Sequence, residues 1–526
     1  MPAQVSRFTF LAKALAALLL VAAADWLFTD FLIGSWLGGL ALTWVIALAL
    51  VRRVTRRGPA RVALICAAGF ALALIYQPGP LTWVMFWSAL SIAALLPRTP
   101  GFDDAWRWTI RLLAHGFSSP LALVVDVRRL AGNRGYQERP TIRSTVAMLA
   151  LPVLMSALFI ALFASANPLI AQLFANVRLP SFWEAGFWLF ALAIIWPSLR
   201  PTAWVTRVVE GIPEAEVTLP GASLPSVLVS LVLFNAVFAI QNGLDLAFLW
   251  SGAPLPAGGS LAEYAHRGAY PLIGTALLAG IFVLTTMKPG SPTAASPAIR
   301  KLVVLWVGQN LLLVASSILR TCDYIGIYML TGWRIAALAW MGLVALGLVL
   351  ICWRMLTGRS ARWLINSNAL AATTLLAVAT IVDLDAMSAE WNVNHAREVG
   401  GQGVALDLCQ LNMMGSAALL PLTELEGRKL DSEFRERVTF VRRDILARTA
   451  TEQRDWRTWN WLDQHRLDRV GAMPGHRPGR AVSVNRDCSG AMIVEEVVPP
   501  AQETPPAQPS TARSVLRPAL TERPAA

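Results

Sequence analysis

Long apolar runs separated by short polar stretches recur along this chain. Eleven of these runs are close to the roughly 20 residues that a helix needs to cross a bilayer. They are continuously apolar, whereas the strands of a membrane barrel alternate between apolar and polar side chains. Because lipid offers no partner to an unpaired backbone group, only helices or closed barrels cross a membrane, and this pattern favours helices. The predicted spans are 10–28, 31–50, 62–77, 81–97, 144–165, 182–199, 224–250, 268–287, 301–320, 332–355 and 367–386.

Composition supports the same class of protein. Hydrophobic residues make up 55% of the 526 residues and charged residues only 15%, against roughly 25% charged residues in soluble domains. These values exclude an ordinary soluble domain. We therefore predict an all-α, polytopic α-helical membrane protein with about 11 transmembrane helices. A small helical extramembrane domain and a disordered tail complete the prediction at the C-terminus.

Basic residues lie mostly on one side of the predicted membrane. With the N-terminus inside, the inner segments carry 23 Lys and Arg residues and the outer loops carry four. Because basic loops are retained in the cytoplasm, this asymmetry supports both the orientation and the odd number of spans. The chain after about Ser388 is then periplasmic, in a bacterial inner membrane. The net charge of +12 belongs to the inner loops, and we expect no nucleic-acid partner.

The spans and the composition divide the chain into five parts. We predict an N-terminal four-helix membrane segment over 1–97, a cytoplasmic amphipathic loop over 98–143, and a seven-helix membrane core over 144–386. A periplasmic, mainly helical domain follows over 387–496. The Pro- and Ala-rich end of the chain, 497–526, has the composition of a disordered tail.

The 98–143 loop contains a candidate interfacial helix. Trp106, Ile110, Leu113 and Phe117 recur at helical spacing, which is typical of an amphipathic helix lying on the membrane surface. We interpret it as an anchoring connector, with a regulatory sensor as the alternative.

The predicted periplasmic domain carries one clear helical pattern. Leu430, Phe434, Val438, Val441 and Ile445 recur three and four residues apart, so they share one helix face. Asp431 is a suitable N-cap for this helix.

Two of the five cysteines, Cys409 and Cys488, lie in this domain. The periplasm is oxidising, which favours a disulfide between them. Spacing alone does not bring two Cα atoms within bonding range, so two free thiols are the alternative.

Common catalytic and cofactor motifs do not occur. The chain has no GxGxxG, no P-loop, no HExxH and no GxSxG sequence, the patterns that mark nucleotide, metal and nucleophile sites. Its five histidines are dispersed, and no pair has metal-ligand spacing on one helix. The sequence therefore predicts no metal and no cofactor.

Polar residues within the spans stand out, because a charged group costs roughly 2.5–3.5 kcal/mol to insert into a bilayer. Asn235, Asn242 and Asp245 are seven and three residues apart and share one helix face. Arg320 and Asp323 are three residues apart and can touch. The predicted polar intramembrane cluster consists of Asn235, Asn242, Asp245, Tyr264, Arg267, Arg320, Asp323, Tyr324, Tyr328, Thr331 and Arg334.

Two interpretations of this cluster are open. Asp245, Arg320, Asp323 and Arg334 lie at similar predicted depth near the outer boundary, so two carboxylates and two guanidiniums could neutralise each other. The cluster is then a brace that fixes helix packing. Alternatively it lines a polar cavity that opens outward and takes a ligand, an ion or a proton.

Four stretches, 233–250, 261–273, 318–340 and 389–398, resemble a bacterial family of polytopic membrane proteins. That family has a Tyr-Ala-x-x-Gly stretch, an Arg-x-x-x-Tyr-x-x-x-Tyr-x-Leu-Thr-x-x-Arg stretch, and an Asn-rich step after the last span. One departure is Met329, where the family pattern has Gly. The matching positions here are Tyr264, Ala265, Gly268, Arg320, Tyr324, Tyr328, Leu330, Thr331, Arg334 and Asn392.

The family is catalogued only as a domain of unknown function, the 4173 type, related to the 4153 type. The resemblance covers about residues 140–425 and implies no established activity.

We expect a non-enzymatic inner-membrane protein with an outward-facing polar pocket that senses, binds or helps to assemble something at the envelope. Its expected partners are the lipid bilayer and either a small ligand or an envelope protein. A transporter of a small solute or lipid is the first alternative, although it needs a polar passage and the inner halves of the spans look apolar. A membrane enzyme on a lipid-linked substrate is the second. Its only candidate bases are Asp245 and Asp323, which neighbouring arginines would make poor bases.

Overall fold

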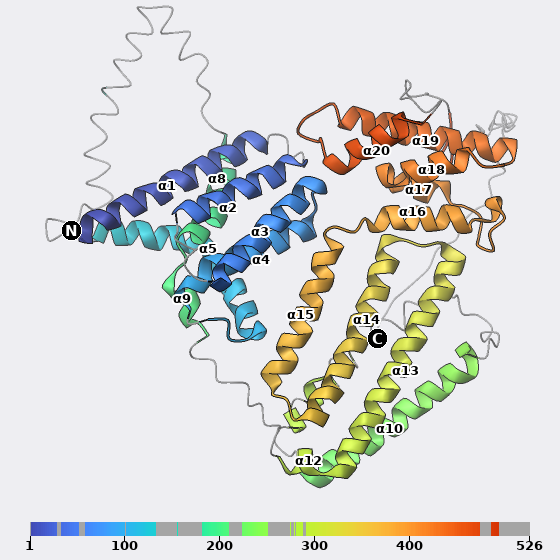
Figure 1. Cartoon of the computed structure of the whole chain (residues 1–526), viewed down its shortest axis with the longest axis horizontal. Helices are drawn as coiled ribbons and strands as arrows, with labels where there is room; N and C mark the ends of the chain where they lie inside the picture. Colours follow the sequence, from blue (N-terminus) through green and yellow to red (C-terminus); the bar gives the residue numbers. More distant parts are fainter. Residues whose placement is uncertain are drawn as a thin grey trace, which may run out of the picture.

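A computed structural model of the protein shows three groups of helices (Figure 1). An N-terminal bundle (α1–α5, α8 and α9) and a membrane core (α10 and α13–α15) stand side by side, and an extramembrane domain (α16–α20) lies across one end of both. The structure describes residues 2–28, 33–51, 58–99, 101–132, 155, 181–209, 223–250, 274, 278, 280–283, 285–287, 291–473 and 485–493.

Small residues let the helices of the N-terminal bundle pack closely. At Gly38 of α2, an added Cβ would lie 2.6 Å from the carbonyl oxygen of Ala71 in α3, so only glycine permits this approach. Ala67 and Ala71 are themselves fully buried. The helices are α1 (Pro2–Leu27), α2 (Trp36–Val51), α3 (Gly58–Tyr76), α4 (Pro80–Leu95), α5 (Ala105–Gly132), α8 (Phe182–Leu199) and α9 (Ala203–Arg207).

Helix α8 belongs to this bundle by its packing. The indole of Trp44 in α2 donates a hydrogen bond to Ser198 of α8 at 2.8 Å, and Phe10 of α1 contacts Trp196 edge to face. The sequence analysis assigned 182–199 to the seven-helix core, because chain order alone does not reveal which bundle a span joins.

Helix α5 fits the amphipathic pattern predicted for the 98–143 loop. Trp106, Leu113 and Phe117 are exposed, so α5 presents an apolar face to its surroundings. Arg111 is buried and pairs with Asp103 at 2.6 Å. The unpaired apolar face is what a helix at a membrane surface requires.

The membrane core consists of long apolar helices. They are α10 (Leu224–Asp245), which ends in a π-helical turn (Leu246–Trp250), α13 (Pro297–Tyr328), α14 (Gly332–Thr357) and α15 (Ala361–Ala379). Helices α10 and α13 run parallel, since Asn235 contacts Leu302 and Asn242 contacts Gln309. The chain between two parallel helices must return to its starting side, and the described residues of 274–286 are helical.

Seven described helices are long and apolar enough to cross a membrane, and the bent pair α15 and α16 would make eight. The apolar part of α2, Trp36–Leu50, is shorter. Of the eleven predicted spans, all of 144–165 except Met155 and most of 268–287 lie outside the described residues. The other nine each coincide with an apolar helix. The chain is therefore an all-α, membrane-embedded protein.

Two predicted spans differ from the structure at their C-terminal ends. The ninth span was predicted to end at Arg320, but α13 continues to Tyr328. The eleventh span was predicted to continue to 386, but α15 ends at Ala379 and the chain bends by 69° into α16 (Leu384–His395). Asp383 causes the second difference, because its carboxylate accepts the backbone N–H of Ala386 at 3.0 Å and caps the new helix.

The extramembrane domain has its own apolar core. Its further helices are α17 (Leu408–Met413), α18 (Leu419–Glu426), α19 (Ser432–Glu452) and α20 (Trp461–Gly471). From the predicted helix face, Val438, Val441 and Ile445 are buried in this core, while Leu430 and Phe434 pack against its edge. Asp431 caps α19, as the sequence predicts.

The domain binds the N-terminal bundle through the loop before α20. The Ser35 N–H donates to the Trp459 carbonyl at 2.8 Å, and the Trp461 N–H donates to the Ser35 hydroxyl at 3.1 Å. The Trp36 indole donates to the Arg457 carbonyl at 2.8 Å. The loops after α1 and after α13 therefore meet the domain on the same side (Figure 1).

A buried ionic cluster ties α20 to the end of the last span. Arg466 pairs with Asp383 and, at 2.7 Å, with Asp463, and it donates to Ser416 at 2.6 Å. Burial lowers the pKa of Arg466 to about 10, which leaves the guanidinium charged at neutral pH. Burial also raises the pKa of Asp463, although hydrogen bonds from Ser416 and Asn460 oppose that shift. The charged arginine thus holds two acidic side chains from different elements.

Candidate functional site

A ladder of amide side chains joins α10 to α13 within the membrane core. Asn235 donates to the Leu302 carbonyl at 3.1 Å and accepts from the Gln309 side chain at 2.9 Å. About two turns further along, Asn242 donates to the Gln309 carbonyl at 3.2 Å. These contacts give partners to amide N–H groups that would otherwise face hydrocarbon, and they fix the register of the two helices. The side-chain oxygens of Asn242 and Gln309 are buried without a partner among the described residues.

An ion pair stands at the C-terminal end of the ladder. The carboxylate of Asp245 accepts a hydrogen bond from the guanidinium of Arg320, and both side chains are largely buried. Gln241 donates to the same carboxylate at 3.2 Å. Trp250 donates to Ser316 at 3.1 Å just beyond. The structure thus brings Asn235, Asn242, Asp245 and Arg320 together in one seam.

The other charged residues of the predicted cluster lie elsewhere. Asp323 is exposed, and none of the ion pairs within the described ranges includes it. Arg334 donates to the carbonyls of Tyr328, at 2.6 Å, and Met329, and its guanidinium lies 4.5 Å from the ring centre of Tyr324. Arg334 therefore closes the C-terminal end of α13, where free carbonyls attract a cation. Tyr264 and Arg267 lie outside the described residues.

The turn between α13 and α14 is held by several contacts. Met329 has φ +65°, a conformation that side chains other than glycine rarely adopt. Its side chain is buried in the extramembrane core, and its sulfur accepts the Asp407 N–H at 3.2 Å. Thr331 caps α14 by accepting the Arg334 N–H at 3.3 Å. This turn therefore packs into the extramembrane domain and connects it to the membrane core.

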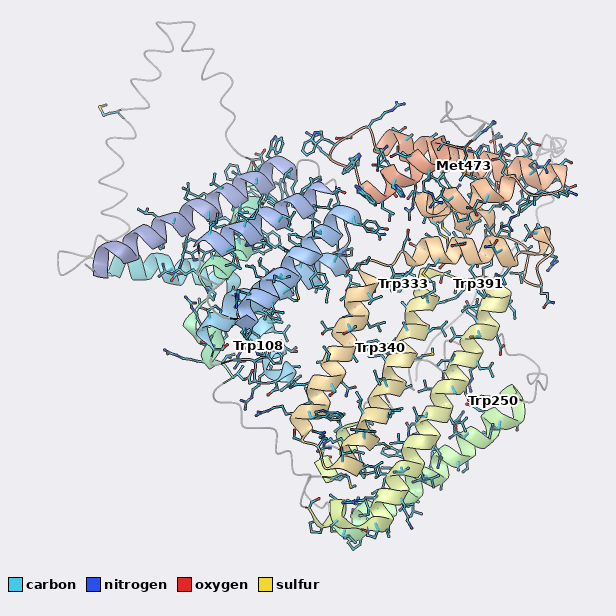
Figure 2. The ribbon with its side chains drawn as sticks, viewed as in Figure 1. Trp108, Trp250, Trp333, Trp340, Trp391 and Met473 are labelled. Carbon is cyan, nitrogen blue, oxygen red and sulfur yellow. A yellow bond between two sulfur atoms is a disulfide. The ribbon has the colours of Figure 1, made fainter. Side chains whose placement is uncertain are left out.

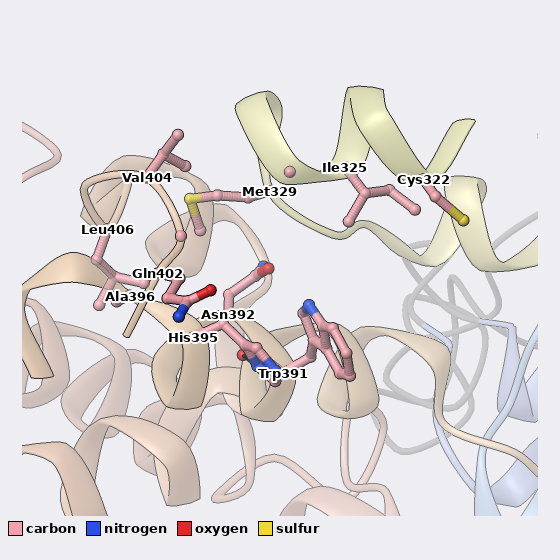
Figure 3. Close-up of a pocket in the computed structure, with 12 residues that line it drawn as sticks. Cys322, Ile325, Met329, Trp391, Asn392, His395, Ala396, Gln402, Val404 and Leu406 are labelled. Carbon is pink, nitrogen blue, oxygen red and sulfur yellow. Dashed lines mark hydrogen bonds between the residues drawn. The ribbon is translucent and has the colours of Figure 1, made fainter. Parts of the chain in front are cut away.

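A cavity of about 230 Å³ lies directly beside this turn. Figure 3 shows Trp391 and Asn392 rising from α16 toward the end of α13, with Met329 closing the far side. The lining residues share a position between the last turns of α13, helix α16 and the loop that follows it. They are Cys322, Ile325, Gly326, Met329, Trp391, Asn392, His395, Ala396, Gln402, Gly403, Val404 and Leu406.

The walls of the cavity are mainly apolar and carry few polar groups. The Asn392 amide is already used by the backbone of Leu330. His395 stacks on Trp391 with ring centres 3.7 Å apart, and its Nδ1 lies 2.9 Å from the Trp391 carbonyl. That leaves the Trp391 indole N–H, His395 Nε2 and the exposed Gln402 amide as polar groups available to a ligand.

The sequence did not predict this cavity, because its lining comes from segments about 60 to 80 residues apart. Neither segment alone has a pattern that indicates a binding site. Asn392 was the one signal, through the resemblance. Within the described residues, no group of three or more His, Cys, Asp or Glu side chains is placed to hold a metal ion.

The structure joins Cys409 and Cys488 by a disulfide, which decides between the two alternatives that the sequence left open. The bond attaches the segment 485–493 to α17, and Asn412 reinforces it by donating to the Cys488 carbonyl at 3.2 Å. Arg437 of α19 donates to Ser489 at 2.9 Å. The disulfide is therefore a structural staple for the extramembrane domain.

Comparison of the chain with curated proteins and with solved structures finds no match. A family model described as "Domain of unknown function (DUF4153)" matches residues 63–425. The matched region begins in α3 and ends in α18, so it contains the polar seam, the turn at Met329 and the cavity. The finer assignment to the 4173 type stays a prediction. Because the match covers more than half of its length, the chain belongs to this DUF4153 family of unknown function.

Proposed function

We propose that this protein is a non-enzymatic binding protein of the bacterial inner membrane, with its ligand site in the cavity between α13 and α16. Its N-terminus is cytoplasmic and its extramembrane domain periplasmic. In that location the protein senses or binds a small ligand, or helps to assemble the envelope. This proposal depends mainly on one observation, the cavity that lies where the membrane core meets the extramembrane domain.

The position of the cavity supports a sensing role. Met329, Asn392 and Leu406 both line it and hold the membrane core to the extramembrane domain. A ligand that fills the cavity would contact the membrane core and the extramembrane domain at once. Its binding free energy would therefore depend on how these two groups of helices are arranged. Differential contact of this kind is what lets a ligand shift a conformational equilibrium.

Two observations support the proposed orientation. The loops that the charge asymmetry assigns to the outside, after α1, α3 and α13, are on the side of the extramembrane domain (Figure 1). The domain also carries the Cys409–Cys488 disulfide, and structural disulfides persist in oxidising compartments such as the periplasm.

The polar seam counts against the two alternative functions, a transporter and a membrane enzyme. A transporter needs a polar passage through the bilayer, whereas the seam is a set of paired side chains between two touching helices. An enzyme needs a free general base. The Asp245 carboxylate is engaged by Arg320 and Gln241, so this alternative rests on Asp323, which is exposed. The seam is better suited to bracing the core beneath the cavity.

Orientation is tested by thiol labelling at Cys322, which is exposed and lines the cavity. Cys66→Ser and Cys352→Ser remove the other free thiols and leave the disulfide intact. In spheroplasts, a membrane-impermeant maleimide should label Cys322. Labelling that requires rupture of the inner membrane would overturn the periplasmic assignment.

Binding is tested by native mass spectrometry of the full chain extracted with its surrounding lipid. Gly326 lines the cavity, and a Cβ added there meets no atom within 4 Å. Gly326→Leu should therefore fill the cavity without a clash, and replacing a helical glycine favours the helix by up to about 1 kcal/mol. Gly308→Leu is the matched control, because Gly308 is also exposed, on α13 and free of close neighbours. A bound molecule should be lost from the Gly326→Leu variant only. Equal occupancy in all three proteins would refute a ligand site here.

A further inference from the structure

The cavity lies at the level where the membrane ends. Helix α13 has 32 residues, or about 48 Å at 1.5 Å per residue, while the hydrocarbon core of a bilayer is about 30 Å thick. The helix is therefore too long to be contained in lipid. Its last two turns, which carry Cys322, Ile325 and Gly326, line the cavity. Met329, directly after the helix, also lines it and is buried in the extramembrane core.

Exposed aromatic side chains mark the same level. Trp333 at the start of α14 is 88% exposed and Trp391 on α16 is 47% exposed. Figure 2 shows Trp333 and Trp391 close to the joint between the membrane core and the extramembrane domain. Tryptophan and tyrosine collect at the membrane–water boundary, where one end of the side chain is apolar and the other is hydrated. The exposed Tyr328 completes a belt beside the cavity.

The cavity is open on the side of this belt. Cys322, Gly326 and Trp391 line it and are exposed, and Gly326 leaves a gap on the surface of α13. A lipid at the boundary can therefore reach the space sideways. A space of about 230 Å³ suits a short length of chain better than a whole lipid.

The lining predicts the chemistry of the occupant. No acidic, lysine or arginine side chain is among the twelve lining residues, so a charged ligand would lose its hydration without gaining a counter-ion. Ile325, Met329, Val404 and Leu406 offer apolar contact. His395 and Gln402 offer hydrogen bonds at the edge. This combination fits a molecule with an apolar chain and an uncharged polar head.

We infer that the cavity takes the chain of a neutral amphiphile from the adjacent leaflet of the bilayer, with its head group at His395 and Gln402. This inference rests on the proposed binding function and names its ligand class. The amphiphile enters between Gly326 and Trp391, and its chain then contacts the side chains that join the two groups of helices.

Protection of Cys322 tests the inference. The full chain with Cys66→Ser and Cys352→Ser is placed in phosphatidylcholine nanodiscs, and the rate of maleimide modification is measured. 1-Decanoylglycerol at ten times its half-protecting concentration should slow the reaction about tenfold, because about a tenth of the sites stay free. Glycerol supplies a polar head without a chain, and decyltrimethylammonium supplies a chain with a charged head. Each should leave the rate of modification within about twofold of the rate without a probe.

Two variants assign the effect to the cavity. In Gly326→Leu, decanoylglycerol should give no protection beyond that of the new side chain. In Gly308→Leu, it should protect as in the parent protein. This pattern in the two variants supports the inference.

Three results would overturn the inference, and they differ in what else they affect. Equal protection by glycerol would indicate a water-soluble ligand, and the proposed binding function would stand. Equal protection by decyltrimethylammonium would show that the ligand is an amphiphile whose head group need not be neutral. Absence of protection by all three probes, with full Cys322 reactivity in Gly326→Leu, would refute the binding function as well.

Discussion

The side-chain amide of Asn392 forms both of its backbone hydrogen bonds with one residue, Leu330. It accepts the Leu330 N–H at 2.7 Å and donates to the Leu330 carbonyl at 2.8 Å. The amide therefore pairs with the turn between α13 and α14 as a neighbouring strand would. Asn392 is buried, at 4% exposure. This pair of hydrogen bonds is a direct lock between the extramembrane domain and the membrane core.

Removing this lock should loosen the domain. Asn392→Ala leaves the half-buried Leu330 N–H without its partner, while the Leu330 carbonyl keeps a hydrogen bond from the Gln410 side chain at 3.4 Å. One unsatisfied group costs about 1–3 kcal/mol when it is buried. We expect a lower midpoint of thermal unfolding and faster proteolysis between α15 and α16. Asn394→Ala is the control, because exposed Asn394 only accepts a hydrogen bond from the Arg428 side chain at the surface. If both variants behave like the parent protein, the amide pair does not hold the domain.

The backbone at Met329 leads to a second prediction. Its φ of +65° costs about 1–3 kcal/mol for a residue other than glycine. Met329→Ala keeps the strain and loses the buried side chain, at a cost of about 2–5 kcal/mol. Met329→Gly loses the same side chain but relieves the strain. We expect the glycine variant to be the more stable of the two in chemical unfolding, the reverse of the usual order in helices. A more stable alanine variant would show that the turn carries no strain.

The pairing of Asp245 with Arg320 gives a third prediction. Each single reversal, Asp245→Arg or Arg320→Asp, leaves two like charges buried together, and breaking a buried pair typically costs about 3–5 kcal/mol. The double reversal restores opposite charges in the same place. We expect the single variants to accumulate poorly in membranes and the double variant to recover, as judged by protein level and thermal unfolding.

Arg334 supplies the control for this pair, because it donates to the carbonyls at the end of α13 instead of to Asp245. Asp245→Arg should therefore not rescue Arg334→Asp. Rescue there, or a double variant no better than the singles, would mean that Asp245 and Arg320 are not partners.

The polar seam was accessible to sequence reasoning, and the cavity was not. Asn235, Asn242 and Asp245 share a helix face by their spacing alone, and Arg320 is the nearest basic residue at similar depth, so an ion pair could be anticipated. The end of α13 could not be anticipated in the same way. The apolar run ends at Arg320, yet the helix continues to Tyr328 because Met329 and Leu330 beyond it are held by the extramembrane domain.

Contacts between distant segments set the same limit elsewhere. Trp36 and Arg457 are 421 residues apart, and no local pattern links them. Their contact depends on how two groups of helices meet. Such contacts are determined by tertiary packing, which overrides local propensity.

The meeting of these groups at Gly34 gives the final prediction. A Cβ at Gly34 would lie 2.4 Å from the Arg457 carbonyl oxygen and 2.7 Å from that of Trp459, and backbone atoms at such distances must move. Gly34→Ala should therefore push the loop before α20 off the N-terminal bundle and break the adjacent bonds of Ser35. Trypsin should then cleave at Arg457 faster than in the parent protein. Gly39→Ala is the control, because Gly39 lies on neighbouring α2 with no atom within 4 Å of an added Cβ. Since the clash involves only the docked arrangement, each bundle should remain folded, and unchanged cleavage would mean that this loop does not rest on Gly34.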